Sequence, residues 1–294
     1  MRDHVVPTHM AERPNVYLTA RNRPENLLLA RQALRGFADA AGVEGVALAD
    51  ITTAVSEACT NVMLHAYDGA VGLLELELGL TDEGVLAVVR DAGVGIRPRV
   101  ALERGGAHGG VGLTVILALA QSVEFVEPPG GGTEVRMEFA CETGLLDEPP
   151  ADRRVAEAQA RFAAAAEDRD AVGVLVASPR VAARVLARVL CAAAARADFS
   201  TDGLADTEVL AEAIVGQCEA VLDAEYLPAL LAIAPRSLSL RVGPLEIPDP
   251  AALAGTAGGS FALLIDRLDC ETAVFAEDGG TSLEMRIPAL DGAI

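Results

Sequence analysis

Hydrophobic and polar residues alternate in several short segments of the first half of the chain, and each such segment predicts a strand. In segment 73–80, four leucines lie on one side while Glu75 and Glu77 lie on the other, which is typical of a half-buried strand. Further strands are expected at 16–20, 85–91 and 133–139.

Apolar residues with helical spacing predict three helices among these strands. The first, 24–42, has Pro24 at its start and Gly42 at its expected C-terminal stop. The second runs from about residue 48 to 66 and the third over 111–121. Helices mixed with antiparallel strands predict an α+β fold, a two-layer α/β sandwich with helices on one face of a sheet.

The chain of 294 residues is long enough for two domains of ordinary size. Residues 1–15 are mostly polar and interrupted by Pro7 and Pro14, and we expect an N-terminal arm there. The composition changes at 142–170, which we interpret as a linker with an Ala-rich segment that could be helical. The two domains are then expected at 16–141 and 171–290.

The second half repeats features of the first in the same order. The segment that begins at Leu175 parallels the one that begins at Leu18, and Gly-Gly-Thr occurs at 131–133 and again at 279–281. Alanine- and leucine-rich sequence can align with itself by chance, but an ordered series of matches favours two copies of one domain. The sequence therefore predicts a tandem duplication.

Composition excludes several classes of function. The formal charge of −20 argues against the phosphate backbone of nucleic acids as a main partner. The chain contains no lysine, so a P-loop or another mechanism that needs a catalytic lysine is excluded. Five scattered cysteines indicate small buried side chains in a reducing compartment. Without a signal peptide or a long apolar run, we expect a soluble, cytoplasmic protein that does not bind membranes.

Three motifs in the first half combine residues suited to nucleotide chemistry. Glu57 and Asn61 lie one helical turn apart on the second predicted helix. The segment DAGVGI (91–96) follows a strand, and GGAHGGVGL (105–113) leads into a helix whose free amides can receive phosphate oxygens. Each motif alone is more often a solvated helix face, an ordinary turn or a plain loop, so their order and spacing carry the interpretation.

In this order the motifs resemble the ATP-binding domain of the GHKL superfamily, over roughly residues 16–140. Within that superfamily, SEACTNVMLHAY (56–67) is most similar to the bacterial anti-sigma-factor serine/threonine kinases. The resemblance implies a Bergerat-type ATP-binding fold with ATP and Mg²⁺ as cofactors. The roles it implies are a general base (Glu57), a Mg²⁺ ligand (Asn61), an adenine anchor (Asp91) with its pocket glycines (Gly93, Gly95), the ATP lid (Gly110, Gly112) and a contact beside the adenine (Thr133).

Two histidines near these motifs have ordinary explanations. His65 could be a ligand, but a histidine near the end of a helix, within the family's usual H-A-Y ending, explains it better. His108 falls in the expected lid and could simply be exposed.

The second copy departs from the pattern at the positions that matter for ATP. Glu212 aligns with Glu57, but Gly216, or Gln217 with a shifted gap, replaces the asparagine. The D-x-G-x-G motif is absent from 171–290, so we predict a degenerate domain that does not bind nucleotide. Kinases of this family commonly pair as homodimers, so the tandem copy could make the chain an intramolecular pseudo-dimer, and we expect a monomer.

The sequence thus favours an ATP-dependent serine/threonine protein kinase of the anti-sigma-factor type. Its expected partners are a sigma factor that it sequesters, an antagonist protein that it phosphorylates, or both. The alternative is a non-catalytic ATP-gated binding protein, which would not need the base Glu57. A sensor histidine kinase is disfavoured because we find no phosphoacceptor helix before residue 16. A gyrase-type or chaperone-type ATPase would be expected to bring a transducer domain with a lysine that reaches the site. It is disfavoured because the chain has no lysine.

Overall fold

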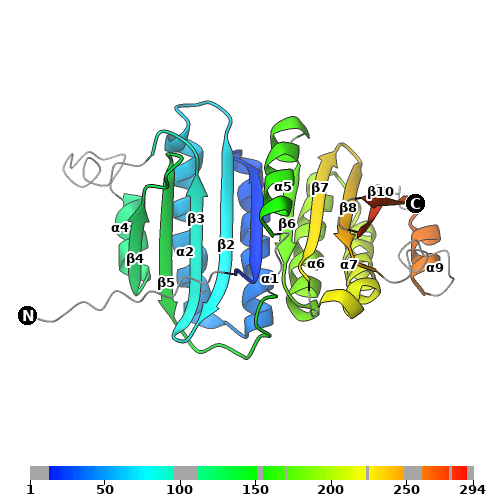
Figure 1. Cartoon of the computed structure of the whole chain (residues 1–294), viewed down its shortest axis with the longest axis horizontal. Coiled ribbons are helices and arrows are strands. Elements are labelled where there is room, and N and C mark those ends of the chain that lie inside the picture. Colours follow the sequence, from blue (N-terminus) through cyan, green and yellow to red (C-terminus); the bar gives the residue numbers. More distant parts are fainter. Residues whose placement is uncertain are drawn as a thin grey trace, which may run out of the picture.

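Ten strands form one continuous antiparallel sheet in the described part of the chain (Figure 1). The structure is a computed structural model, and it describes residues 13–95, 111–150, 155–169, 171–222, 225–247, 260–277 and 280–289. The strands are β1 (Val16–Arg21), β2 (Leu73–Thr81), β3 (Gly84–Asp91), β4 (Ser122–Val126), β5 (Thr133–Ala140), β6 (Val172–Val176), β7 (Leu227–Ala234), β8 (Ser237–Leu245), β9 (Glu271–Glu277) and β10 (Gly280–Pro288). Their order is β4-β5-β3-β2-β1-β6-β7-β8-β10-β9.

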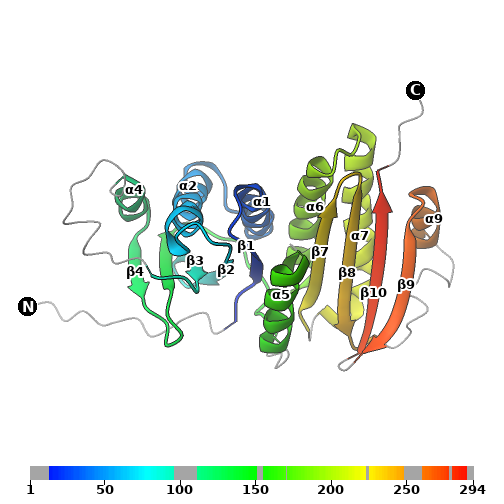
Figure 2. The ribbon, with the colours of Figure 1, turned by 90° about the horizontal axis from the view of Figure 1, so that it is seen from above.

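Most of the helices lie on one face of this sheet, so the predicted α+β sandwich is confirmed (Figure 2). The helices are α1 (Pro24–Ala41), α2 (Gly45–Asn61), the π-helix η1 (Val62–Ala66), α4 (Val111–Leu119), α5 (Val155–Arg169), α6 (Pro179–Arg196), α7 (Thr201–Leu222) and α9 (Ser260–Arg267). The strands and helices predicted for 16–140 are present. Strand β4 was not predicted.

The local sequence explains where α1 begins and ends. Pro24 occupies the first turn, where its missing amide hydrogen costs no helical hydrogen bond. Gly42 caps the other end with φ +71°, a left-handed conformation that glycine adopts without a steric penalty. Leu29, Leu34 and Phe37 are buried on one side of the helix, so the apolar stripe faces the sheet.

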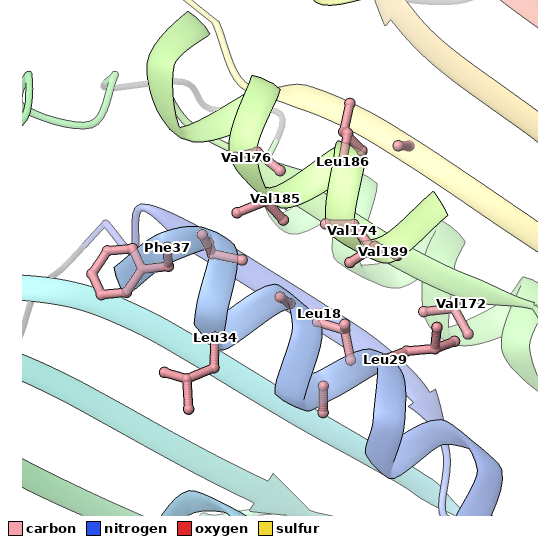
Figure 3. Packing of buried hydrophobic residues seen from close by; sticks show 14 of the residues in the cluster. Leu18, Leu29, Leu34, Phe37, Val172, Val174, Val176, Val185, Leu186 and Val189 are labelled. Carbon is pink, nitrogen blue, oxygen red and sulfur yellow. The ribbon is translucent and has the colours of Figure 1, made fainter. Parts of the chain in front are cut away.

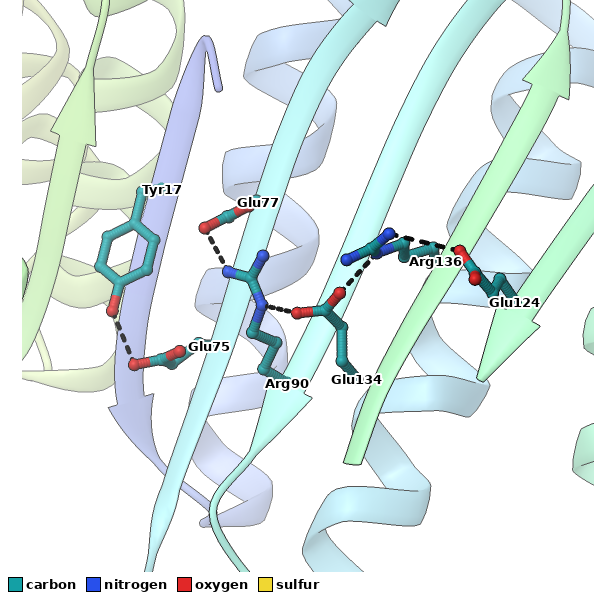
Figure 4. Close-up of polar contacts among 7 residues, drawn as sticks. All are labelled: Tyr17, Glu75, Glu77, Arg90, Glu124, Glu134 and Arg136. Atoms are coloured by element: carbon teal, nitrogen blue, oxygen red, sulfur yellow. Dashed lines mark hydrogen bonds and ion pairs between the residues drawn. The ribbon is translucent and has the colours of Figure 1, made fainter. Parts of the chain in front are cut away.

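The opposite face of the sheet in the first half is polar. Arg90 on β3 pairs with Glu77 on β2 and with Glu134 on β5, and Glu134 also pairs with Arg136 (Figure 4). The Tyr17 hydroxyl donates a hydrogen bond to Glu75 at 2.8 Å. These cross-strand pairs explain why glutamates alternate with the buried leucines of β2.

The second half has the same element order as the first. Strands β9-β10-β8-β7-β6 follow each other as β4-β5-β3-β2-β1 do, starting from the opposite edge of the sheet. Helices α6, α7 and α9 stand in the same sequence among these strands as α1, α2 and α4. This arrangement supports the predicted duplication.

The two halves meet at strands β1 and β6. These strands pair in antiparallel fashion, from Val16 opposite Val176 to Thr19 opposite Gly173. On the helical side, α1 packs against α6, and one buried apolar cluster contains side chains from both halves (Figure 3). Separating the two halves would expose the apolar side chains of this shared core to water, which is unfavourable. The two halves therefore form one structural unit.

Helix α5 covers the other face of this junction. Phe162 on α5 is buried in a small cluster with Tyr17 on β1, Leu175 on β6 and Tyr226. The Nε of Arg21 donates a hydrogen bond to the Ala166 carbonyl of α5 at 2.7 Å. The segment expected to be a linker with a possible helix therefore contains a helix that is packed against the sheet on the side opposite α1 and α6 (Figure 2).

Gly36 lets α1 and α6 approach closely. A Cβ at this position would lie 2.7 Å from the Arg184 carbonyl oxygen and 2.7 Å from the Val185 Cα, which are backbone atoms that cannot rotate away. We expect Gly36→Ala to lower the free energy of unfolding by about 1–3 kcal/mol, because the helices must move apart. Chemical denaturation of the full chain measures this change.

Gly216 provides the matched control, because it lies in helix α7 and a Cβ there would meet nothing within 4 Å. Gly216→Ala should leave stability unchanged or raise it by up to about 1 kcal/mol through helix propensity. A Gly36→Ala variant as stable as Gly216→Ala would contradict the tight contact between the two halves.

Candidate nucleotide site

Helix α2 presents Glu57 and Asn61 on its partly exposed side. Ala54, Val55 and Ala58 are buried on the core side of the same helix. Directly after Asn61 the helix continues as the π-helix η1, a wider turn that often occurs at functional sites. The two polar side chains are therefore one turn apart on a helix anchored in the core.

Gly112, in the first turn of α4, lies against these two side chains. A Cβ on Gly112 would be 2.7 Å from Glu57 Oε2 and 3.6 Å from Asn61 Oδ1. Only a residue without a side chain fits this contact without displacing the carboxylate. The start of α4 thus meets Glu57 and Asn61. Gly110 and His108 lie outside the described residues.

Asp91, the last residue of β3, is 6% exposed and lies opposite Thr133 on β5. Its Oδ1 accepts a hydrogen bond from the Gly93 amide at 2.8 Å. Its Oδ2 is buried and has no hydrogen-bond partner among the described residues. Burial raises the pKa of the carboxyl, while the Gly93 amide and the nearby amide and hydroxyl of Thr133 act in the lowering direction. The Thr133 groups lie near the carboxylate but do not meet hydrogen-bond geometry with Oδ2. An unpartnered buried oxygen of this kind is suited to accept a hydrogen bond from a ligand.

The glycines after Asp91 allow the loop to pack closely on its neighbours. A Cβ on Gly93 would lie 1.9 Å from the Ala66 carbonyl oxygen at the end of η1. Gly95 has φ +81°, and its Cβ would be 3.2 Å from the Gly132 carbonyl oxygen, next to Thr133. The loop therefore lies between the helix that carries Asn61 and the strand that carries Thr133.

The predicted residues thus fall into two groups at one edge of the sheet. One group contains Glu57, Asn61 and Gly112. The other group contains Asp91, Gly93, Gly95 and Thr133. The end of η1 connects the groups, because the Val94 amide donates to the Ala66 carbonyl at 2.7 Å.

Two residues of the site were missed by sequence reasoning. Gly132 has φ +89°, and a Cβ there would lie 2.0 Å from the Asp91 carbonyl oxygen. Its signal was the Gly-Thr pair that opens the strand at 133–139, to which the resemblance assigned a role only at Thr133. Tyr67 contacts the loop through its hydroxyl, which accepts a hydrogen bond from the Ala92 amide at 2.9 Å. Tyr67 ends the H-A-Y segment that helped to carry the resemblance, but the resemblance assigned it no role.

Metal binding by clustered side chains is not indicated in the described residues. They contain no group of three histidine, cysteine or acidic side chains that could hold a metal ion, and His65 is exposed. All five cysteines are free; Cys59 and Cys218 are buried as predicted, whereas Cys141, Cys191 and Cys270 are only half-buried. Burial raises the pKa of the Cys59 thiol to about 12. A hard ion at this site would therefore depend on single oxygen ligands such as the Asn61 amide, with ligand oxygens completing its shell.

The corresponding site in the second half lacks these groups. With Pro24 aligned to Pro179, helices α2 and α7 align without a gap, so that Glu212 and Gly216 take the positions of Glu57 and Asn61. Thr281 on β10 lies opposite Leu245, whereas Thr133 lies opposite the carboxylate of Asp91. The second half therefore has neither the amide nor the carboxylate at these positions.

We expect Asp91→Asn to raise the melting temperature of the ligand-free protein at neutral pH. The folded-state pKa of Asp91 is raised, so its ionised form costs stability at neutral pH, and this cost disappears as the pH falls below the pKa of the unfolded chain. The advantage of the variant should therefore shrink toward acidic pH in thermal unfolding at a series of pH values. The exposed Asp82→Asn is the control, and an advantage of Asp91→Asn that persists at acidic pH would contradict this account.

Comparison with known proteins finds relatives of the first half of the chain. Residues 20–139 match the histidine kinase-like ATPase domain. The anti-sigma F factor of Caldanaerobacter subterraneus subsp. tengcongensis is 32% identical over 123 residues, which cover 40% of this chain and 86% of the relative. The anti-sigma F factor of Oceanobacillus iheyensis is 33% identical over 125 residues, which cover 38% of this chain and 83% of the relative.

A third relative, the anti-sigma F factor of Thermoanaerobacter sp. strain X514, is 30% identical over 123 residues, covering 40% of this chain and 86% of the relative. Within the described residues, every helix is too short or too polar to cross a membrane. The matched region contains all the predicted site residues, from Glu57 to Thr133. By these matches, the chain belongs to the histidine kinase-like ATPase family that includes the anti-sigma F factors.

Proposed function

We propose that the chain is an ATP-dependent serine/threonine protein kinase of the anti-sigma-factor type, with its working site in the first half. The observation that carries this proposal is the pairing of two features at one edge of the sheet. One is the buried, unpartnered Oδ2 of Asp91. The other is the contact of Glu57 and Asn61 with the glycine at the start of α4.

The residues present suit ATP and Mg²⁺. Asp91 would accept a hydrogen bond from the adenine amino group, and its buried Oδ2 is free for that contact. Asn61 would hold Mg²⁺ through its amide oxygen. Gly112 belongs to the first turn of α4, and the unpaired backbone amides of a helix start would receive phosphate oxygens. When bound, the ion would neutralise charge on the phosphates during transfer.

Glu57 is the proposed general base. It would accept the proton of a serine or threonine hydroxyl on the substrate protein as that oxygen forms its bond to the γ-phosphorus of ATP. The bond between the γ-phosphorus and the β,γ-bridging oxygen breaks, and its electron pair leaves with ADP. A non-catalytic ATP-gated binding protein is the second candidate. The kinase is favoured because Glu57 Oε2 lies at the start of α4 beside Asn61.

A sigma factor, an antagonist protein, or both are the proposed partners. The support is that several relatives are named anti-sigma F factors. Phosphorylation of the antagonist and sequestration of the sigma factor are separate activities, so either can be tested in the absence of the other.

We further propose that the second half is a degenerate copy that pairs with the first half inside one chain. The repeated strand order, the pairing of β1 with β6, and the packing of α1 on α6 support this intramolecular pseudo-dimer. The edge strand β1, which would be open for pairing in an isolated first half, is covered by β6. The chain should therefore be a monomer with one nucleotide site.

Incubation of the purified chain with γ-labelled ATP, Mg²⁺ and any small antagonist-like protein that the neighbouring genes encode tests the kinase proposal directly. The expected result is label on a serine or threonine of the antagonist. ATP binding without any transfer would leave the non-catalytic regulator as the function.

A further inference from the structure

Tyr67 joins three segments of the nucleotide site through one hydroxyl group. This hydroxyl donates a hydrogen bond to the Leu73 carbonyl at 2.6 Å and accepts hydrogen bonds from the amides of Leu73, at 3.1 Å, and Ala92, at 2.9 Å. A phenol has one donor and two acceptor positions, so all of them are in use. The hydroxyl therefore connects the end of η1, the start of β2 and the loop that follows Asp91.

The ring of Tyr67 fixes the place of this hydroxyl. It lies over Gly72, where a Cβ would come within 2.0 Å of the ring carbon Cε1. Burial raises the pKa of the phenol, so it stays protonated at neutral pH and keeps its donor hydrogen. Neither the ring nor the hydroxyl can be moved without disturbing the backbone around it.

The loop after Asp91 is attached to the helix end at two successive positions. The Ala92 amide bonds to the Tyr67 hydroxyl, and the Val94 amide bonds to the Ala66 carbonyl at 2.7 Å. Asp91 directly precedes this attachment, and its own Oδ1 receives the Gly93 amide between the two. The direction of the free Oδ2 of Asp91 thus depends on a loop that the helix end holds.

From this geometry we propose that Tyr67 is a positioning residue for nucleotide recognition, which holds the Asp91 loop at a fixed place relative to the helix that carries Asn61. This role rests on the proposed function of the site. It makes adenine selectivity depend on a hydroxyl whose donor and acceptor positions are all taken up by the protein backbone. Guanine carries an acceptor oxygen where adenine carries its amino group, so a well-placed Asp91 carboxylate discriminates between the two.

The test compares Tyr67→Phe with the wild-type full chain in titrations with Mg-ATP and Mg-GTP. Phenylalanine keeps the ring over Gly72 and removes only the hydroxyl. We expect ATP affinity to fall about tenfold, GTP affinity to fall less, and the preference for ATP over GTP therefore to shrink. Tyr226→Phe is the control, because that hydroxyl donates to the Pro14 carbonyl in another part of the fold.

The outcomes separate this role from the function on which it rests. A wild-type chain that binds no ATP would overturn the proposed function. If the wild type binds ATP, a Tyr67→Phe affinity within twofold of the wild type would overturn the positioning role. Equal losses for ATP and GTP would also overturn it, because a merely structural hydroxyl would not change selectivity.

Discussion

Replacing Glu57 with alanine should slow phosphoryl transfer by about two to four orders of magnitude while leaving ATP affinity nearly unchanged. The carboxylate lies at the start of α4 beside Asn61, so it can take a proton from a hydroxyl that attacks the terminal phosphate. It is not expected to hold the adenine or the metal. Single-turnover transfer from labelled ATP measures the rate, and a nucleotide titration measures the affinity.

The chain contains its own control for this variant. Glu212 occupies the same helical position in α7 and is exposed. Glu212→Ala should leave both the rate and the affinity unchanged. A rate for Glu57→Ala within threefold of the wild type would remove Glu57 from the chemistry, even if ATP still binds.

Replacing Asn61 with alanine should abolish binding of Mg-ATP and all activity with it. Mg²⁺ takes oxygen ligands and keeps several waters, so one protein oxygen in addition to the phosphates can be essential. Alanine has no oxygen to offer, and the described residues around the site form no alternative cluster of metal ligands. Titration with ATP in the presence and absence of Mg²⁺ measures the effect.

The matched control for Asn61 is Gln217 on α7, an amide side chain one residue beyond the corresponding position in the second half. Gln217→Ala should bind Mg-ATP as the wild type does. Unchanged affinity of Asn61→Ala for Mg-ATP would contradict the assignment of the metal ligand and of the site around it.

The parts of the fold that could be predicted are those that depend on local sequence. Pro24 and Gly42 mark the ends of α1 because their backbone preferences act within one turn. The alternating leucines of β2 report one buried face, and Leu76 and Leu78 are indeed fully buried. The contacts among Glu57, Asn61 and Gly112 agree with the resemblance, which implied that these residues share one site.

Other features depend on contacts between distant segments and could not be predicted. The sequences of 16–21 and 172–176 do not show that these two strands pair. A strand that is buried on both faces has the same kind of sequence at the edge of a sheet as in its middle. The Ala-rich sequence of α5 suggested a helix, but it did not show that Phe162 would pack on the sheet face opposite α1 and α6. The three hydrogen bonds of Tyr67 join residues that only the folded chain brings together.

The most direct test of this account is a titration of the full chain with Mg-ATP at known oligomeric state. Light scattering should give the mass of one 30.4 kDa chain, and calorimetry should give one ATP per chain, with binding lost in Asn61→Ala. Two nucleotides per chain would contradict the degenerate second half, and a stable homodimer would contradict the internal pairing. No binding at all would contradict the proposed site.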